Sequence, residues 1–446
     1  MSLVSLNPPN ERKLALIGLL IRIVLFYLPT EGLRDSVSKS FTLTTAFDSN
    51  LHVKEFLYLK RNKNNDSVIT NASRVSPITG LIFGVFYGDN GSRSACFAID
   101  LVTALMLRAL HLRLVRGKNA HENEENVSVF GFYLVHPMIL MSLLSRSQRC
   151  VEFLSIVLVF YVALDEGKRA EMMTGVALAA LTLIYAPAAI AMFPGVLAHF
   201  LCNGESKNDS SNDSSSLLVS GRKRGVQFVM QYFFALATLV NVADRYVVPN
   251  DSLRTWLRIA IFDRFTGKEL QPNVGLQWYV YSLVWKRFLS WYYVAFQGCS
   301  IACTIALAIR FSSSSSASSS PSSKTAKNRE AQRVAPLFSS CVALFSTIAL
   351  SSHPSLGEFA FVSLLCLAFA NVSLTSKNAQ KIVLDGAMIA IAIFGLSFVT
   401  LRAWLETRTG NPNYFFAVTL MFALGQVYIV YHAINFALLA LKKKES

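Results

Sequence analysis

Residues 411–431 read NPNYFFAVTLMFALGQVYIVY, a polar turn with a proline that runs directly into a long apolar stretch. A membrane-spanning helix needs about 20 mostly apolar residues, and aromatic side chains gather where such helices meet the membrane surface. The stretch therefore predicts a spanning helix that begins near residue 414. Its turn would bring amides and aromatic rings to the depth of a lipid head group, which suits an amphipathic ligand. The candidate binding residues of this turn are Asn411, Asn413, Tyr414 and Phe415.

The composition of the whole chain agrees with a membrane protein. Of its 446 residues, 53% are hydrophobic and 15% are charged, and the mean hydropathy is +0.42. These values exclude an ordinary soluble globular protein. We expect an all-α polytopic membrane protein that forms one domain over residues 1–446. Twelve predicted spans lie near residues 14–30, 95–115, 127–145, 150–166, 171–185, 187–202, 225–248, 276–310, 334–352, 355–374, 380–404 and 414–441.

An even number of spans places both termini on the same side of the membrane. Short cytosolic connections carry an excess of Lys and Arg, and the net charge of +15 is concentrated between the spans. We therefore expect cytosolic termini. The basic residues of the connections on that side are Arg116, Lys118, Lys168, Arg169, Arg222, Lys223, Arg224, Lys324, Lys327, Arg329, Arg333, Lys377, Lys381 and the lysines at 442–444.

The connections differ in composition. Residues 203–221 and the serine-rich 312–330 hold too few apolar residues to offset the entropy of ordering, so they predict disordered cytosolic loops. The longer loops 31–94 and 249–275 fall on the lumenal side, and each has the pattern of an amphipathic interfacial helix, one beginning at Asp48 and one over 251–265. Sequons on this side stand at Asn65, Asn71, Asn90 and Asn250.

No stretch of the chain has the spacing of a known catalytic or metal-binding motif. HExxH, GxSxG, the P-loop and GxGxxG are all missing, and the seven histidines are scattered. The seven cysteines lie in or at the ends of apolar segments without CxxC spacing, which favours packing roles. Metal, acyl-serine and nucleotide chemistry are therefore unsupported, and we expect no metal site and no cofactor. Because Lys and Arg lie mainly between the spans, we also expect no nucleic-acid partner.

Two further features mark candidate binding residues. A carboxylate within a span is costly unless it faces a cavity or a partner, which singles out Asp100 and, at the start of a span, Glu358. The segment 271–279 repeats the combination of a proline turn and interfacial aromatics, with Asn273 and Trp278 as its candidates. If the two turns faced one another, they would form a groove with amides at its mouth and rings below, although ordinary interfacial turns would look the same.

Five short motifs resemble the PIG-U family, the multispanning subunit of the glycosylphosphatidylinositol (GPI) transamidase. The last is the Asn-Pro-Asn turn followed by Gly425-Gln426. The resemblance runs from about residue 70 to the C-terminus, and it departs from the family at His136-Pro137, where Asn-Pro is usual. The other four motifs are residues 76–80 (SPITG), 100–104 (DLVTA), 272–279 (PNVGLQWY) and 354–358 (PSLGE).

The resemblance implies a scaffold like that of GT-C glycosyltransferases and a non-catalytic role in the endoplasmic reticulum membrane. The chain would bind GPI and present its amine, while the nucleophilic cysteine would belong to another, protease-like subunit. The dilysine ending at 443–444 fits retrieval to that compartment. Two alternatives remain at this point: a glycosyltransferase that uses a dolichol-phosphate sugar with Asp48 as base, and a lipid transporter or scramblase.

Overall fold

The computed structural model describes most of the chain, and all regular structure in the described part is helical. The described residues are 9–27, 32, 78–79, 82–83, 89–115, 129–165, 167, 169–202, 214–246, 272–316, 326–373 and 376–442. Asp48, the predicted interfacial helices beginning at Asp48 and over 251–265, and the sequons at Asn65, Asn71 and Asn250 lie outside them. The likeness to a GT-C scaffold stays a prediction.

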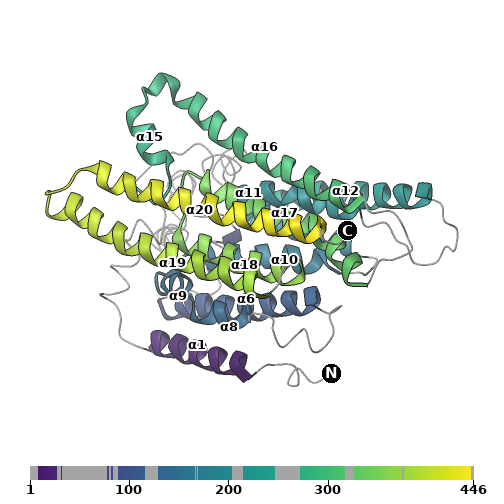
Figure 1. Ribbon diagram of the computed structural model, residues 1–446, viewed down its shortest axis with the longest axis horizontal. Helices are drawn as coiled ribbons and strands as arrows, with labels where there is room; N and C mark the ends of the chain where they lie inside the picture. Colours follow the sequence, from purple (N-terminus) through teal and green to yellow (C-terminus); the bar gives the residue numbers. More distant parts are fainter. Residues whose placement is uncertain are drawn as a thin grey trace.

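The helices follow the predicted spans (Figure 1). Six of them are long and apolar enough to cross a membrane, at 94–115, 170–202, 220–243, 286–313, 384–406 and 412–435, and shorter apolar helices cover 333–349 and 356–369. The predicted class, a polytopic helical membrane protein, is confirmed. The helix bounds are α1 Pro9–Tyr27, α6 Asp89–Val115, α8 Val129–Val135, α9 Pro137–Leu144, α10 Arg149–Ala163, α11 Ala170–Cys202, α12 Ser214–Tyr246, α15 Gln277–Leu283, α16 Leu289–Ser316, α17 Ala326–Ala349, α18 Leu356–Ser373, α19 Ser376–Leu401 and α20 Pro412–Lys442.

The long helix α11 is a hairpin of two arms. Tyr185 has non-helical backbone angles (φ −147°, ψ 81°), and Pro187 follows it. In one straight helix, residues 171 and 200 would lie about 44 Å apart. Yet Arg224 forms an ion pair with Glu171, and its guanidinium carbon lies 5.7 Å from the centre of the Phe200 ring. The two ends of α11 therefore lie side by side, as the separate spans predicted at 171–185 and 187–202 require.

Two predicted spans are interrupted. The span predicted at 127–145 divides into α8 and α9, because Pro137 has no N–H to donate and restricts His136 to an extended conformation (φ −65°, ψ 120°). The long window 276–310 divides into α15, a break at Val284 and Trp285, a short 3₁₀ turn over Lys286–Phe288, and α16. The window is longer than the roughly 20 residues that one crossing needs, and helix α15 takes up the excess before the break.

Several connections are shorter than predicted. Helix α12 begins at Ser214, so the loop predicted at 203–221 ends before it. Helix α16 continues to Ser316 and α17 begins at Ala326, which shortens the serine-rich loop predicted at 312–330 from both ends. Helix α6 begins at Asp89 and similarly shortens the loop 31–94. In each case a helix extends past its apolar core, as expected when each added residue contributes one more backbone hydrogen bond.

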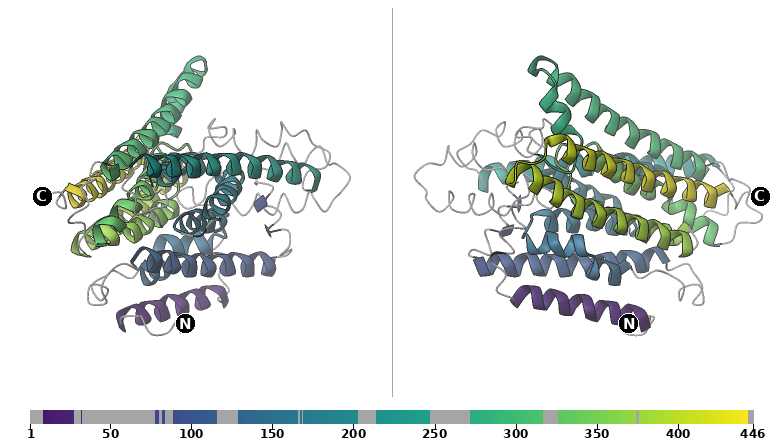
Figure 2. Two further views of the ribbon diagram at one scale, coloured as in Figure 1. Left: turned by 90° about the vertical axis from the view of Figure 1, so that its right-hand side faces the viewer. Right: turned by 60° about the vertical axis from the view of Figure 1, so that its left-hand side comes forward.

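The helices form one bundle around α11, α17 and α18 (Figures 1 and 2). Helix α18 is buried along residues 356–369 and packs against α6, α9, α17, α19 and α20. Helix α1 lies on one flank, while α15 and α16 form a corner on the opposite flank. The first turn of α1 and the last turn of α20 lie at one end of the bundle, and the turn between α19 and α20 lies at the other, which we call the turn end (Figure 1).

Large apolar side chains remain exposed on the outer helices, as expected for surfaces in contact with lipid tails rather than water. Leu20 of α1, Phe234 of α12, Met388 of α19 and Leu424 of α20 are all more than half exposed. A water-soluble bundle would cover most of this surface, so the exposed side chains agree with a membrane environment.

Candidate functional site

The two predicted aromatic turns meet at the turn end of the bundle. The Tyr279 hydroxyl of α15 donates a hydrogen bond to the side-chain oxygen of Asn413, although the two residues are far apart in the sequence. The Tyr279 ring stacks on Phe416, with 4.1 Å between ring centres, and the Trp278 ring lies 5.5 Å from that of Phe415. The start of α20 and helix α15 therefore form one layer of rings, here called the aromatic junction and defined by Trp278, Tyr279, Phe415 and Phe416.

The turn before α20 carries its amides on the outside of this junction. The Asn411 side-chain oxygen accepts a hydrogen bond of 2.9 Å from the Asn413 backbone N–H, which starts the helix. Asn411, Asn413 and Tyr414 are exposed, whereas Phe415 is fully buried. The predicted arrangement of amides outside and a ring beneath them is thus present here, with Tyr414 facing outward and Phe415 inward.

Asn273 has a different environment from the one predicted. It is buried, its amide nitrogen donates to the Ser352 carbonyl at 2.9 Å, and its oxygen accepts from the Gly275 N–H at 2.7 Å. A Cβ on Gly275 would lie 2.8 Å from Pro354, so glycine is needed for this close approach. Asn273 therefore holds the turn before α15 against the segment 350–355, and its amide does not face outward as a ligand contact would require.

Three buried polar atoms of α15 have no hydrogen-bond partner among the described residues. They are the Trp278 indole N–H, the Tyr281 hydroxyl and the Gln277 side-chain oxygen. Burial, with a smaller contribution from Tyr293, raises the pKa of the Tyr281 hydroxyl above its ordinary value, so this group keeps its proton. Buried polar groups normally have partners, and two of these three are donors suited to phosphate or sugar oxygens.

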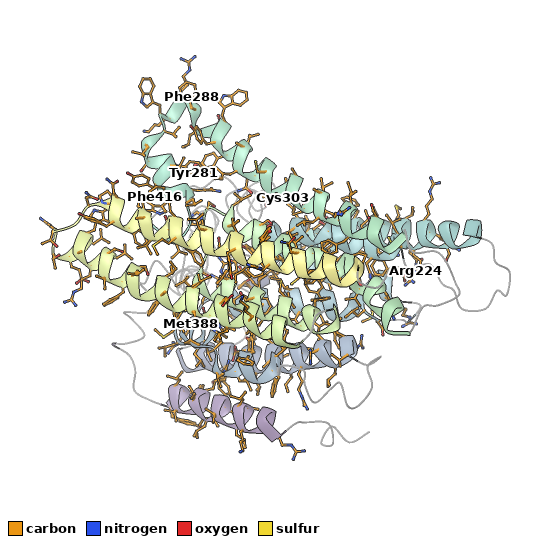
Figure 3. The ribbon with its side chains drawn as sticks, in the orientation of Figure 1. Arg224, Tyr281, Phe288, Cys303, Met388 and Phe416 are labelled. Atoms are coloured by element: carbon orange, nitrogen blue, oxygen red, sulfur yellow. The ribbon has the colours of Figure 1, made fainter. Side chains whose placement is uncertain are left out.

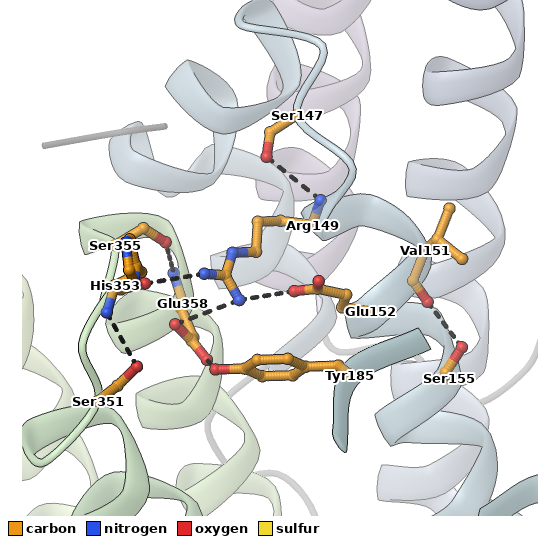
Figure 4. Close-up of polar contacts among 10 residues, drawn as sticks. All are labelled: Ser147, Arg149, Val151, Glu152, Ser155, Tyr185, Ser351, His353, Ser355 and Glu358. Carbon is orange, nitrogen blue, oxygen red and sulfur yellow. Dashed lines mark hydrogen bonds and ion pairs between the residues drawn. The ribbon is translucent and has the colours of Figure 1, made fainter. Parts of the chain in front are cut away.

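A second cluster joins the predicted candidate Glu358 to Arg149, Glu152 and Tyr185, which sequence analysis did not single out (Figure 4). The Arg149 guanidinium contacts Glu152 at 2.6 Å and Glu358 at 3.5 Å, and it donates to the His353 carbonyl at 3.1 Å. The Tyr185 hydroxyl donates to the other oxygen of Glu358. His353 belongs to the segment 350–355, which also accepts the hydrogen bond from Asn273 in the turn before α15. The ion cluster therefore helps to hold the segment against which α15 packs. Charged residues at the start of the span predicted at 150–166 were the available signal.

Asp100 lies on the opposite flank, away from the other candidates. Its carboxylate accepts from the Arg22 side chain at 2.7 Å and from the Tyr133 hydroxyl at 2.8 Å. Arg22 also donates to the carbonyls of Tyr133 and Leu134. The carboxylate therefore joins α1, α6 and α8, and it has the structural role that was the alternative to a binding role.

The candidate residues thus fall into two groups, with Asp100 apart and the others together at the turn end: Asn411, Asn413, Tyr414, Phe415, Trp278 and the buried Asn273. The described residues contain no group of three His, Cys, Asp or Glu side chains arranged to hold a metal ion. The model of one protein family, described as GPI transamidase subunit PIG-U, matches residues 16–422. The chain belongs to the PIG-U family. A direct comparison with curated proteins finds no match.

Membership in the PIG-U family makes the chain a subunit of the GPI transamidase, which attaches GPI anchors, and makes the other subunits its partners. It also agrees with a multi-pass protein of the endoplasmic reticulum membrane. Three of the motifs that carried the resemblance, at 272–279, 354–358 and 411–416, converge on the turn end, as the contact of Tyr279 with Asn413 and the close approach of Gly275 to Pro354 show. This end is therefore the natural place to seek the function of a PIG-U chain.

Proposed function

We propose that this PIG-U chain is a non-catalytic subunit that binds the GPI lipid at the aromatic junction and presents its ethanolamine amine to a cysteine-protease-like catalytic subunit. The observation that carries the proposal is the contact between Tyr279 and Asn413, because it joins the two aromatic turns into one surface. The exposed amides of Asn411 and Asn413 suit the sugars and phosphates of GPI.

The acyl chains of the lipid would follow the apolar surface next to the junction. Leu283 and Trp285 are strongly exposed at the corner between α15 and α16. The aromatic side chains of Tyr281, Phe288 and Phe416 lie in the same part of the molecule (Figure 3). A gradient from amides through rings to aliphatic side chains matches the gradient of a glycolipid from head group to tails.

The contribution to the reaction would be proximity and orientation. Fixing the lipid beside the catalytic thioester converts an encounter in the bilayer into a step within one assembly, which contributes several kcal/mol, on the order of 7–11 in favourable cases. No acid or base of this chain is needed for that gain. The turn end would face the lumen, where the amine is used.

Replacing both Asn411 and Asn413 with Ala tests the amides. We expect the amount of GPI that co-purifies with the tagged complex to fall about tenfold, while recovery of the partner subunits stays unchanged, because the lost hydrogen bonds are at an exposed surface. The matched control is Asn241→Ala, since Asn241 is also exposed but lies on α12. Equal loss of GPI and of partner subunits would mean that the turn only supports the structure.

Replacing Trp278 with Phe tests the unpaired indole. The ring contact with Phe415 is kept, and removing a buried N–H that has no partner should leave thermal stability unchanged or raised. Captured GPI should nevertheless decrease severalfold if the lipid accepts that hydrogen bond. Trp291→Phe, at an exposed tryptophan of α16, is the control. Unchanged capture in both variants would remove Trp278 from the proposed site.

A further inference from the structure

Residues of α1, of α6 and of the turn that joins α9 to α10 line a depression. Helix α1 lies on the flank of the bundle opposite α15 and α16 (Figures 1 and 2). It contains about 350 Å³ of space not filled by atoms, including the part that is open to the outside. Its wall combines two guanidinium groups with apolar side chains, and the residues used below are Arg22, Arg146, Leu25, Phe26, Phe97 and Leu143.

Arg22 supplies a buried cation with hydrogen-bonding capacity to spare. Its side chain is fully buried, and it lines the depression. A guanidinium has five N–H groups. Three of them donate within the protein, to Asp100, to the Leu134 carbonyl and to the Tyr133 carbonyl. Two N–H groups of Arg22 are left for an acceptor that the described residues do not provide.

Arg146 adds a second guanidinium to the same wall. Its backbone has a φ of 53°, a conformation that glycine adopts easily and that costs other residues on the order of 1 kcal/mol. The turn is held in place by hydrogen bonds from the Arg146 N–H to the Leu143 carbonyl at 3.0 Å and from the Ser147 N–H to the Ser142 carbonyl at 3.3 Å.

We propose that this depression is a second lipid site, which holds a membrane glycerophospholipid by its phosphodiester. Paired guanidinium N–H groups match the geometry of phosphate oxygens. Leu25, Phe26, Phe97 and Leu143 offer an apolar wall for the start of an acyl chain. The site is separate from the aromatic junction, so it does not depend on the proposed capture of GPI, and a bound lipid would join α1 to the rest of the bundle.

The test is native mass spectrometry of the purified complex titrated with dioctanoyl-phosphatidylinositol. We expect one bound lipid at low concentration. Arg146→Gln should weaken binding about tenfold, as expected for the loss of a charge-assisted contact, and Arg146→Lys should weaken it less. Arg222→Gln, at an exposed arginine of α12 near the other end of the bundle, should leave binding unchanged.

Two further probes separate the phosphodiester from its possible substitutes. Dioctanoylglycerol, which has the same chains and no phosphate, should bind weakly, and inorganic phosphate should compete poorly because it lacks the chains. Equal binding of dioctanoylglycerol would overturn the role of the arginines. Absence of a bound phospholipid in the wild type, or identical affinity in Arg146→Gln, would overturn the site itself, whatever the result for GPI.

Discussion

At the residue scale, the buried ion pair between Arg22 and Asp100 has the clearest consequence for stability. Replacing Asp100 with Leu leaves the Arg22 guanidinium buried without its carboxylate, which should cost about 3–5 kcal/mol. Replacing both, in Arg22→Met with Asp100→Leu, should recover much of the loss because no charge then remains buried. Thermal unfolding in detergent measures both variants.

The control is the exposed pair of Arg402 and Glu406, whose side chains are 61% and 69% exposed. Glu406→Gln should change the free energy of unfolding by less than about 1 kcal/mol, since solvent screens such pairs. A double variant at Arg22 and Asp100 that is no more stable than Asp100→Leu alone would contradict the account of this pair.

The sequence singled out Asp100 as a costly group within a span, but it could not name the partner. Arg22 lies in another predicted span, and only the packing of α1 against α8 brings the two together. Asn273 and Asn413 posed a similar difficulty, because both stand in polar turns before aromatic residues. One proved to be buried against Ser352 and the other exposed, a distinction set by neighbouring segments rather than by local pattern.

At the scale of elements, α19 and α20 pack closely through Gly425. A Cβ on Gly425 would lie 2.8 Å from the Cγ2 atom of Ile389, whereas a Cβ on Gly395 would meet nothing within 4 Å. Gly425→Ala should therefore lower the free energy of unfolding by about 1–2 kcal/mol through overpacking. Gly395→Ala should leave it unchanged or raise it by up to about 1 kcal/mol, since alanine favours the helix. Similar effects for both would mean that the helices move apart without cost.

The hairpin in α11 predicts a short distance between its ends. Spin labels at Met172 and Leu201, which are partly exposed, should lie on the order of 20 Å apart, because neighbouring helix axes are about 8–10 Å apart. A continuous helix would separate them by about 44 Å. Pulsed electron spin resonance in nanodiscs distinguishes the two, and a distance above about 40 Å would rule out the hairpin.

The same element illustrates how far local signals extend. Two spans were predicted within residues 170–202, and the structure places their boundary at Tyr185 and Pro187, where proline interrupts a helix. Pro137 gives the same signal in the predicted span 127–145, yet that window looked continuous because each half is too short to cross a membrane alone. The short helices α8 and α9 are stable only through burial against α1, α6 and α18, which a single sequence does not reveal.

At the scale of the whole molecule, the helical membrane class could be predicted because each apolar window is a local property of the chain, whereas only six of the helices in the described residues are long and apolar enough to be spans, against the twelve predicted. The convergence of residues 272–279, 354–358 and 411–416 could not, because it depends on which spans are neighbours. The segment 350–355 is the link: it receives hydrogen bonds from Asn273, from Gln277 and from Arg149. The candidate site was thus predictable as two turns, and of the ion cluster near it only Glu358 was singled out, because its partners Arg149 and Glu152 belong to another span.

The orientation of the bundle gives the last prediction. The positive-inside rule assigns the end that holds the helix termini to the cytosol and the turn end to the lumen. In sealed microsomes, a membrane-impermeant maleimide should label the exposed Cys202 at once, in a variant whose other exposed cysteines, Cys299 and Cys303, are replaced by Ser. Thr409→Cys, in the exposed turn before α20, should be labelled only after detergent opens the vesicles. The reverse order of labelling would place the helix termini in the lumen and the aromatic junction in the cytosol, away from the side on which the GPI amine reacts. Labelling of both sites in sealed vesicles would place both ends of the bundle on one side of the membrane and would contradict the structure.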